Sequence, residues 1–75
     1  MGRLRPTPYR QVRRKLRSAG FEEISQKGSH VKFIRTIAEG TRVVIVPQHT
    51  GDIPLGTLRS ILNQAGLTPD EFEKL

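Results

Sequence analysis

The 75-residue sequence contains no cysteine, which excludes a disulfide framework and a thiolate metal site and gives no sign of an oxidising compartment. It has no apolar run close to the roughly 18 residues of a membrane span, and no apolar segment follows its basic N-terminal stretch. Aromatic residues make up only 5%, and we expect them in the core. We therefore expect a cytoplasmic protein stabilised by packing, with no membrane partner.

Positive charge is what the sequence has in excess. Thirteen lysines and arginines against seven aspartates and glutamates give a formal net charge of +6. Such an excess indicates a polyanionic partner: nucleic acid fits best, an acidic protein next and an anionic membrane surface third, while a merely solvated face is the alternative. Residues 1–20 contain no acidic residue and seven basic ones, Arg3, Arg5, Arg10, Arg13, Arg14, Lys15 and Arg17.

The first segment with helical periodicity follows Thr7-Pro8, which predicts an N-cap residue followed by proline at the first helical position. Gly20 ends the pattern, so we expect a helix over residues 8–19. Its arginines lie on the faces away from the apolar stripe, which consists of Tyr9, Val12, Leu16 and Ala19.

A second helical pattern begins after Pro54 and ends at Gly66. Thr68 and Glu71 then have the spacing of a capping box around Pro69, which predicts a short final helical turn. The apolar residues expected to pack inward from these two segments are Leu55, Leu58, Ile61, Leu62, Ala65, Phe72 and Leu75.

Between the two helical patterns the period changes to two. The segments FEEISQK, HVKFIRTI and TRVVIVP are rich in β-branched residues and are separated by glycine-containing turns, which predicts an antiparallel meander. Alternation in the second strand places His30 and Lys32 on the face opposite Val31 and Phe33. In the third strand, Val43 and Ile45 alternate with Arg42 and Val44, so the two pairs are expected on opposite faces.

The order of these elements predicts an α+β fold, a small α-β-β-β-α domain that spans residues 1–75 as one unit. Because a chain this short has only one core, both helices are expected on one face of the three-stranded antiparallel sheet. If the helices cover Val31 and Phe33, then His30 and Lys32 lie on the open face.

His30 is the main candidate for proton transfer near neutral pH. It follows Gly28 and Ser29, whose turn can bring the backbone close to a phosphate, and Lys27 and Lys32 flank it with positive charge. RNA carries its own nucleophile, the ribose 2′-hydroxyl, so a general acid or base with cations nearby suits cleavage of a phosphodiester without a metal. A structural or solvent-facing histidine is the alternative.

Other polar residues are weaker candidates. His49 is the second imidazole, and its role stays open between proton transfer and an ordinary loop position. Gly56 and Thr57 open the second helix, whose amide groups and dipole favour a phosphate, with Arg59 within a turn; a simply capped helix is the alternative. No metal-ligand set or nucleotide-binding motif is present, so we expect no metal and no cofactor. The candidate phosphate contacts of the first helix are Arg10, Arg13, Arg14 and Arg17.

With these residues placed, the chain resembles the HicA (also YcfA-like) family of toxin mRNA interferases. The resemblance rests on LRSAGFEEISQKGSHVKF, in which a helix, Gly and Phe lead into a strand and Gly-Ser-His opens the next, on VVIVPQH, and on PLGTLRSILNQAGLTPDEF. It implies a fold like that of double-stranded-RNA-binding domains, metal-independent cleavage of mRNA with His30 as the catalytic histidine, and a HicB-like antitoxin that covers the active site. Val31 departs from many relatives, which carry a polar residue there.

Two functions from other classes remain open at this point. A non-catalytic RNA-binding module of the same fold would hold RNA mainly through phosphate contacts from the first helix and Lys32. A protein-interaction module would use the basic face for an acidic partner alone. The leading hypothesis is an endoribonuclease toxin that acts through His30.

Overall fold

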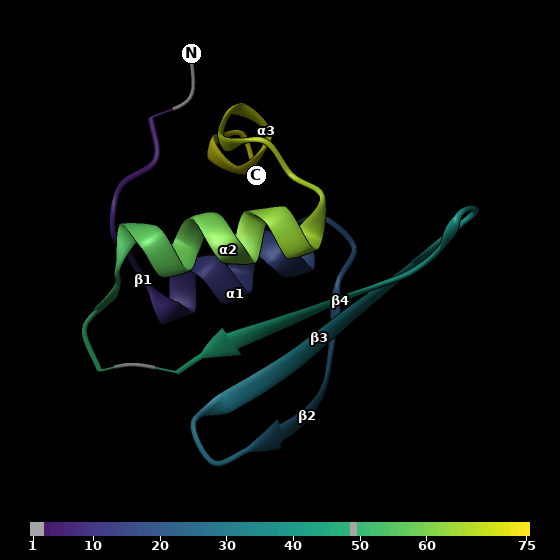
Figure 1. The fold of residues 1–75 in the computed structure, drawn as a ribbon, viewed down its shortest axis with the longest axis horizontal. Coiled ribbons are helices and arrows are strands. Elements are labelled where there is room, and N and C mark those ends of the chain that lie inside the picture. Colours follow the sequence, from purple (N-terminus) through teal and green to yellow (C-terminus); the bar gives the residue numbers. More distant parts are fainter. Residues whose placement is uncertain (1–2, 49) are drawn as a thin grey trace.

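The computed structural model describes residues 3–48 and 50–75. Its elements are β1 (Thr7–Pro8), α1 (Tyr9–Ser18), β2 (Glu22–Lys27), β3 (His30–Ile37), β4 (Gly40–Pro47), β5 (Asp52–Ile53), α2 (Leu55–Ala65) and α3 (Pro69–Glu73) (Figure 1). The three longer strands form an antiparallel sheet in the order β2-β3-β4, and α1 and α2 lie on one face of it (Figure 1). The predicted α+β fold with an α-β-β-β-α order is confirmed.

The alternation in β3 divides the sheet into a covered and an open face, as the sequence predicts. Val31 and Phe33 are fully buried, whereas His30 and Lys32 are exposed. Residues directly opposite each other in an antiparallel pair point to the same side of the sheet. The residues opposite Val31 and Phe33 in β4 are Val46 and Val44, and both are also fully buried.

In β4, Val43 and Ile45 alternate with Arg42 and Val44 as the sequence predicts, and the structure shows which of the two sets is covered. Val44 lies on the covered face, while Val43 is 42% exposed and Ile45 is 38% exposed. The cross-strand register explains this, because Ile45 lies opposite the exposed Lys32. A run of four consecutive β-branched residues has apolar side chains at both parities, so its own alternation does not select a face.

The start of α1 also differs from the sequence prediction. Pro8, not Thr7, is the N-cap residue, and the helix begins at Tyr9. Thr7 is instead extended and lies opposite Ile53 in the short β1-β5 pair. This two-residue pair holds the first turn of α1 next to the segment that joins β4 to α2.

The end of α2 and the start of α3 are as the sequence predicts. Gly66 follows α2 with φ of 71°, in the left-handed region that glycine enters without steric strain. Thr68 and Glu71 form both bonds of a capping box at the start of α3: the Glu71 amide donates to Thr68 Oγ1 at 3.1 Å, and the Thr68 amide donates to Glu71 Oε1 at 2.8 Å. The hydrogen bond from the Thr68 backbone amide, and after it the Thr68 hydroxyl, depress the pKa of the Glu71 carboxyl.

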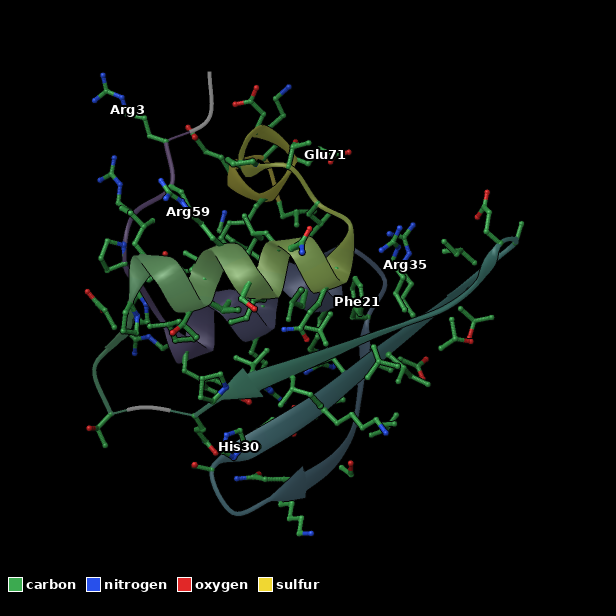
Figure 2. All side chains as sticks on the ribbon, viewed as in Figure 1. Arg3, Phe21, His30, Arg35, Arg59 and Glu71 are labelled. Carbon is green, nitrogen blue, oxygen red and sulfur yellow. The ribbon has the colours of Figure 1, made fainter. Side chains whose placement is uncertain are left out.

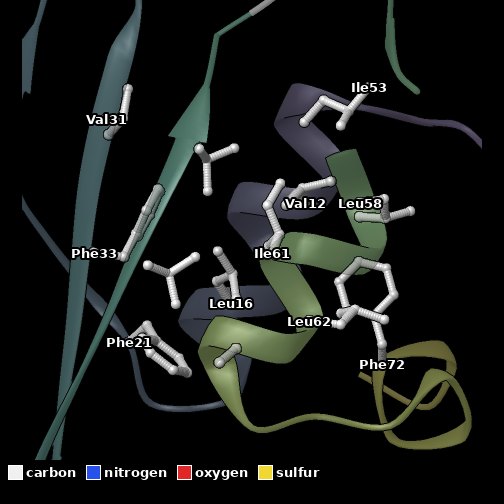
Figure 3. Packing of buried hydrophobic residues seen from close by; sticks show 13 residues of the cluster. Val12, Leu16, Phe21, Val31, Phe33, Ile53, Leu58, Ile61, Leu62 and Phe72 are labelled. Carbon is white, nitrogen blue, oxygen red and sulfur yellow. The ribbon is translucent and has the colours of Figure 1, made fainter. Parts of the chain in front are cut away.

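One hydrophobic core lies between the covered face of the sheet and the helices (Figure 3). Phe33 points from β3 toward Leu16 of α1 and Ile61 of α2, and Phe21 packs at the end of α1 (Figure 3). The core holds the sheet with one face turned to solvent. Its buried members are Val12, Leu16, Phe21, Val31, Phe33, Val44, Val46, Ile53, Leu58, Ile61, Leu62, Ala65 and Phe72.

Candidate active site

His30 is the first residue of β3, and its exposed side chain lies at the end of the sheet where β4 finishes (Figure 2). Across the strands it lies opposite Lys27 of β2 and Pro47 of β4. The imidazole is thus reachable from the open side of the sheet, at a place where three chain segments meet.

Two lysines lie next to His30, as the sequence predicts. Lys27 faces it directly across the β2-β3 hairpin, and Lys32 follows two residues along β3 on the same face. Two residues of strand span about 6.5 Å, so both ammonium groups reach the surroundings of the imidazole. The arrangement places positive charge on both sides of a group able to transfer a proton.

The turn before His30 is formed by Gly28 and Ser29. Gly28 has φ of 60°, and a Cβ at this position would meet no atom within 4 Å. Glycine is favoured here by its backbone conformation and not by crowding. The turn is consequently tight and leaves open space outside its backbone, where a phosphate oxygen can approach.

Two glutamines that the sequence reasoning did not single out hold this turn. The Gln48 amide donates to Ser29 O at 2.6 Å, and Gln26 Nε2 donates to Gly28 O at 3.1 Å and to Gln48 Oε1 at 2.7 Å. The side-chain bond joins residues 22 positions apart. The sequence carries no local signal for it, because it depends on the meander bringing the end of β4 beside the β2-β3 turn.

Arg10 lies at the same end of the molecule as His30. It lines an open recess of about 380 Å³ between the first turn of α1 and the segment after β4. Gln48 also lines this recess, and its amide is bonded to Ser29, the neighbour of His30. The recess therefore borders the turn that precedes His30, but His30 itself does not line it. The residues lining the recess are Pro8, Tyr9, Arg10, Gln48, Thr50, Gly51 and Asp52.

The other arginines of α1 are not gathered at His30. Arg13 forms an ion pair with Glu23 of β2, with 2.8 Å between Nε and Oε1. Burial raises the pKa of the Tyr9 hydroxyl, and the Glu23 carboxylate raises it further. Arg14 donates to Gln11 on the same helix at 3.0 Å. The ion pair between Arg13 and Glu23 thus ties α1 to the sheet, whereas Arg14 bonds within its own helix.

Arg17 and Lys15 complete the basic run of α1. Arg17 is exposed in the last turn, beside Phe21, and so lies at the opposite end of α1 from Arg10. Lys15 points to α3, where its ammonium caps the helix end and lies 5.1 Å from the centre of the Phe72 ring. Burial lowers the Lys15 pKa. Its Nζ donates to the carbonyl oxygens of Phe72, Glu73 and Leu75 at 3.0, 3.2 and 3.3 Å.

The second predicted phosphate site is separate from His30. Thr57 is partly buried in the first turn of α2. Arg59 projects toward Arg3, and in Figure 2 both α2 and β4 lie between Arg59 and His30. A phosphate contact at Thr57 or Arg59 stays a prediction, but it would engage RNA on a different side of the molecule from the imidazole.

The open face also carries apolar side chains. Ile45 lies opposite Lys32, and Val43 lies opposite Ile34. Ile24 is 48% exposed at an irregularity in the pairing of β2 with β3. Clustered exposed apolar residues are a common feature of protein-interaction surfaces. The face that holds His30 is therefore partly apolar.

His49, the second candidate imidazole, lies outside the described residues. Within residues 3–48 and 50–75, no group of three or more histidine, cysteine, aspartate or glutamate side chains is arranged to hold a metal ion. In the same part of the chain, none of the helices has the length and apolar character needed to cross a membrane.

Comparison with known proteins identifies the family. A family model described as the HicA toxin of bacterial toxin-antitoxin systems matches residues 9–67, which include α1, the whole sheet and α2. A search of curated proteins finds no match. The matched region includes His30, the Gly28-Ser29 turn before it, and Lys27 and Lys32. The chain belongs to the HicA family of toxins from bacterial toxin-antitoxin systems.

Proposed function

We propose that this HicA-family toxin is a metal-independent endoribonuclease that cleaves mRNA in the cytoplasm, with His30 as general acid or base. Family membership supports the toxin role. The observation that carries the chemistry is the position of His30, exposed on the open face of the sheet between Lys27 and Lys32.

The proposed reaction uses the nucleophile that RNA itself provides. The 2′-oxygen of a ribose attacks the adjacent phosphorus, the bond from phosphorus to the next 5′-oxygen breaks, and a 2′,3′-cyclic phosphate remains. One proton leaves the 2′-hydroxyl and one reaches the 5′-oxygen; His30 accepts the first as a base or donates the second as an acid. Lys27, Lys32 and the amides of the Gly28-Ser29 turn stabilise the charge on the phosphorane.

RNA is held mainly through its phosphates in this proposal. Arg10, Arg14 and Arg17 are exposed on α1, and Arg10 lines the recess that Gln48 also lines. Arg13 adds charge to the same helix while remaining paired with Glu23. Binding should weaken steeply with salt, because each phosphate contact releases counterions.

The direct test is incubation of the purified, partner-free chain with single-stranded RNA in EDTA, beside His30→Ala. We expect products with 2′,3′-cyclic phosphate ends from the wild type only. A matched substrate with a 2′-deoxyribose at the cleaved position should resist cleavage there. If the deoxy substrate is cut equally well, the 2′-hydroxyl is not the nucleophile; if His30→Ala cleaves normally, the histidine is not catalytic.

A HicB-like antitoxin is the proposed protein partner, and it covers the region around His30. Toxin-antitoxin family membership supports an antitoxin. The exposed Val43 and Ile45 on the open face support this location, because they give a partner apolar surface next to the site. Ile45→Asn, which adds no charge opposite Lys32, should weaken the complex while the free toxin still cleaves RNA, as measured by titrating antitoxin into the cleavage assay. Full toxin activity in a saturated wild-type complex would contradict this arrangement.

A non-catalytic RNA-binding module is the second candidate, and the exposed arginines of α1 favour it. The His30→Ala variant distinguishes the two functions. In a binding module, His30→Ala leaves RNA affinity unchanged and no cleavage product appears with either protein.

A further inference from the structure

Gln26 and Gln48 connect three chain segments around His30. Gln26 belongs to β2, Gly28 and Ser29 form the turn, and Gln48 follows β4. A single side-chain amide, Gln26 Nε2, donates to both Gly28 O at 3.1 Å and Gln48 Oε1 at 2.7 Å. The Gln48 backbone amide adds a third bond, to Ser29 O at 2.6 Å. Two of these bonds are accepted by the carbonyl oxygens of the two residues that precede the histidine, and the third joins the two glutamine side chains.

The fold itself does not require the side-chain bonds. Gln26 and Gln48 are both exposed, and neither belongs to the hydrophobic core. Exposed hydrogen bonds between neutral side chains contribute little to stability, since water competes for the same groups. Two side chains with high conformational entropy are nevertheless ordered at this one turn. Their effect is on the geometry of the turn and not on whether the chain folds.

We propose that Gln26 and Gln48 are positioning residues that hold the Gly28-Ser29 turn, and through it His30, in the orientation needed for RNA cleavage. The inference rests on the proposed catalytic role of His30. Gly28 lies in the left-handed region, from which glycine moves easily to other backbone conformations. Anchoring the Gly28 and Ser29 carbonyl groups removes this freedom. A displacement of about 1 Å in a catalytic group can cost roughly 100-fold in rate, so anchoring has a large effect on turnover.

The test replaces the Gln26 amide in two ways. Gln26→Met keeps the length of the side chain and removes both donated bonds without changing charge. Gln26→Glu places a carboxylate against two acceptor oxygens. We expect both variants to lower kcat about tenfold or more with KM within about threefold of wild type and an unchanged melting temperature. An unchanged kcat in both variants would overturn the inference.

Rescue separates hydrogen bonding from charge. Adding Gln48→Lys to Gln26→Glu restores the bond between positions 26 and 48 but not the bond to Gly28 O, so kcat should recover in part and stay below wild type. The same Gln48→Lys change should not rescue Gln26→Met, which has no acceptor. If Gln26→Glu instead raises KM alone and Gln26→Met has no effect, the cause is repulsion of RNA and the positioning role is refuted.

A measurement without RNA tests the brace independently of the proposed function. In ¹⁵N relaxation of labelled protein, the Ser29 and His30 amides of wild type should have order parameters near 0.85, and those of Gln26→Met should fall toward about 0.6. Unchanged order parameters would refute the claim that Gln26 holds the Gly28-Ser29 turn, even if the protein cleaves RNA. A wild type that cleaves no RNA, combined with a loosened turn in Gln26→Met, would overturn the proposed function and leave the brace established.

Discussion

Adjacent valines in β4 give a sharp test of which face of the sheet is open. Val44 is fully buried and Val43 is 42% exposed. Truncation to alanine removes two methyl-sized groups from each and changes strand propensity equally, so the difference between the two variants reports burial. At about 0.8 kcal/mol per buried group, Val44→Ala loses about 1.6 kcal/mol of transfer free energy. The cavity left behind adds to this, giving about 2 to 3 kcal/mol. Val43→Ala should lose less than about 1 kcal/mol.

Urea unfolding followed by far-UV circular dichroism measures both values. At 0.05 to 0.15 kcal/mol per residue, a chain of this length has about 4 to 11 kcal/mol of stability, so the Val44 loss shifts the midpoint clearly. The slope should be the same for both variants. A larger loss for Val43→Ala would refute the register of β4 against β3. Ile45 would then no longer share the open face with Lys32, and the apolar surface proposed for the antitoxin would disappear.

Two further predictions concern the helices. At the end of α2, Gly66→Ala should lower the melting temperature, because φ of 71° costs alanine about 1 kcal/mol or more and the added Cβ would crowd the Arg42 side chain. Gly56→Ala, inside α2, should raise it, because a Cβ added there meets no atom within 4 Å and the unfolded chain loses entropy. Changes of the same sign would contradict the backbone assignment. At α3, the depressed pKa of Glu71 means that its carboxylate stabilises the fold above its ordinary pKa of 4.5 and that this contribution is lost as the pH falls through the lower folded-state pKa. The difference in melting temperature between wild type and Glu71→Ala should therefore shrink in acid, and a constant difference from neutral to acidic pH would refute this.

The sequence predicts the elements whose patterns are local. Helical spacing with a glycine stop gives α1 and α2, and the Thr68 to Glu71 spacing gives the capping box of α3. Over residues 30–33 of β3, polar and apolar residues alternate, so the open position of His30 follows from the sequence. The candidate catalytic residue and the two lysines beside it were predictable for this reason.

The features that the sequence does not predict all depend on contacts between distant segments. The face of β4 is set by its register with β3, since a run of β-branched residues fits either face. The β1-β5 pair moves the start of α1 by joining Thr7 to Ile53. The use of Arg13 in an ion pair and of Lys15 as a cap for α3 reduces the basic surface that the charge pattern indicates. The brace at the β2-β3 turn likewise exists only in the folded sheet.

The most direct test of the central claim is a paired measurement of single-turnover RNA cleavage and RNA affinity for wild type and His30→Ala. Loss of a general acid or base should lower the cleavage rate by at least about 100-fold. The dissociation constant should stay within about threefold, because one side chain adds little to binding made of many phosphate contacts. A His30→Ala variant that cleaves at the wild-type rate, or a partner-free wild type that binds RNA without cleaving it, would contradict the claim that this histidine cuts RNA.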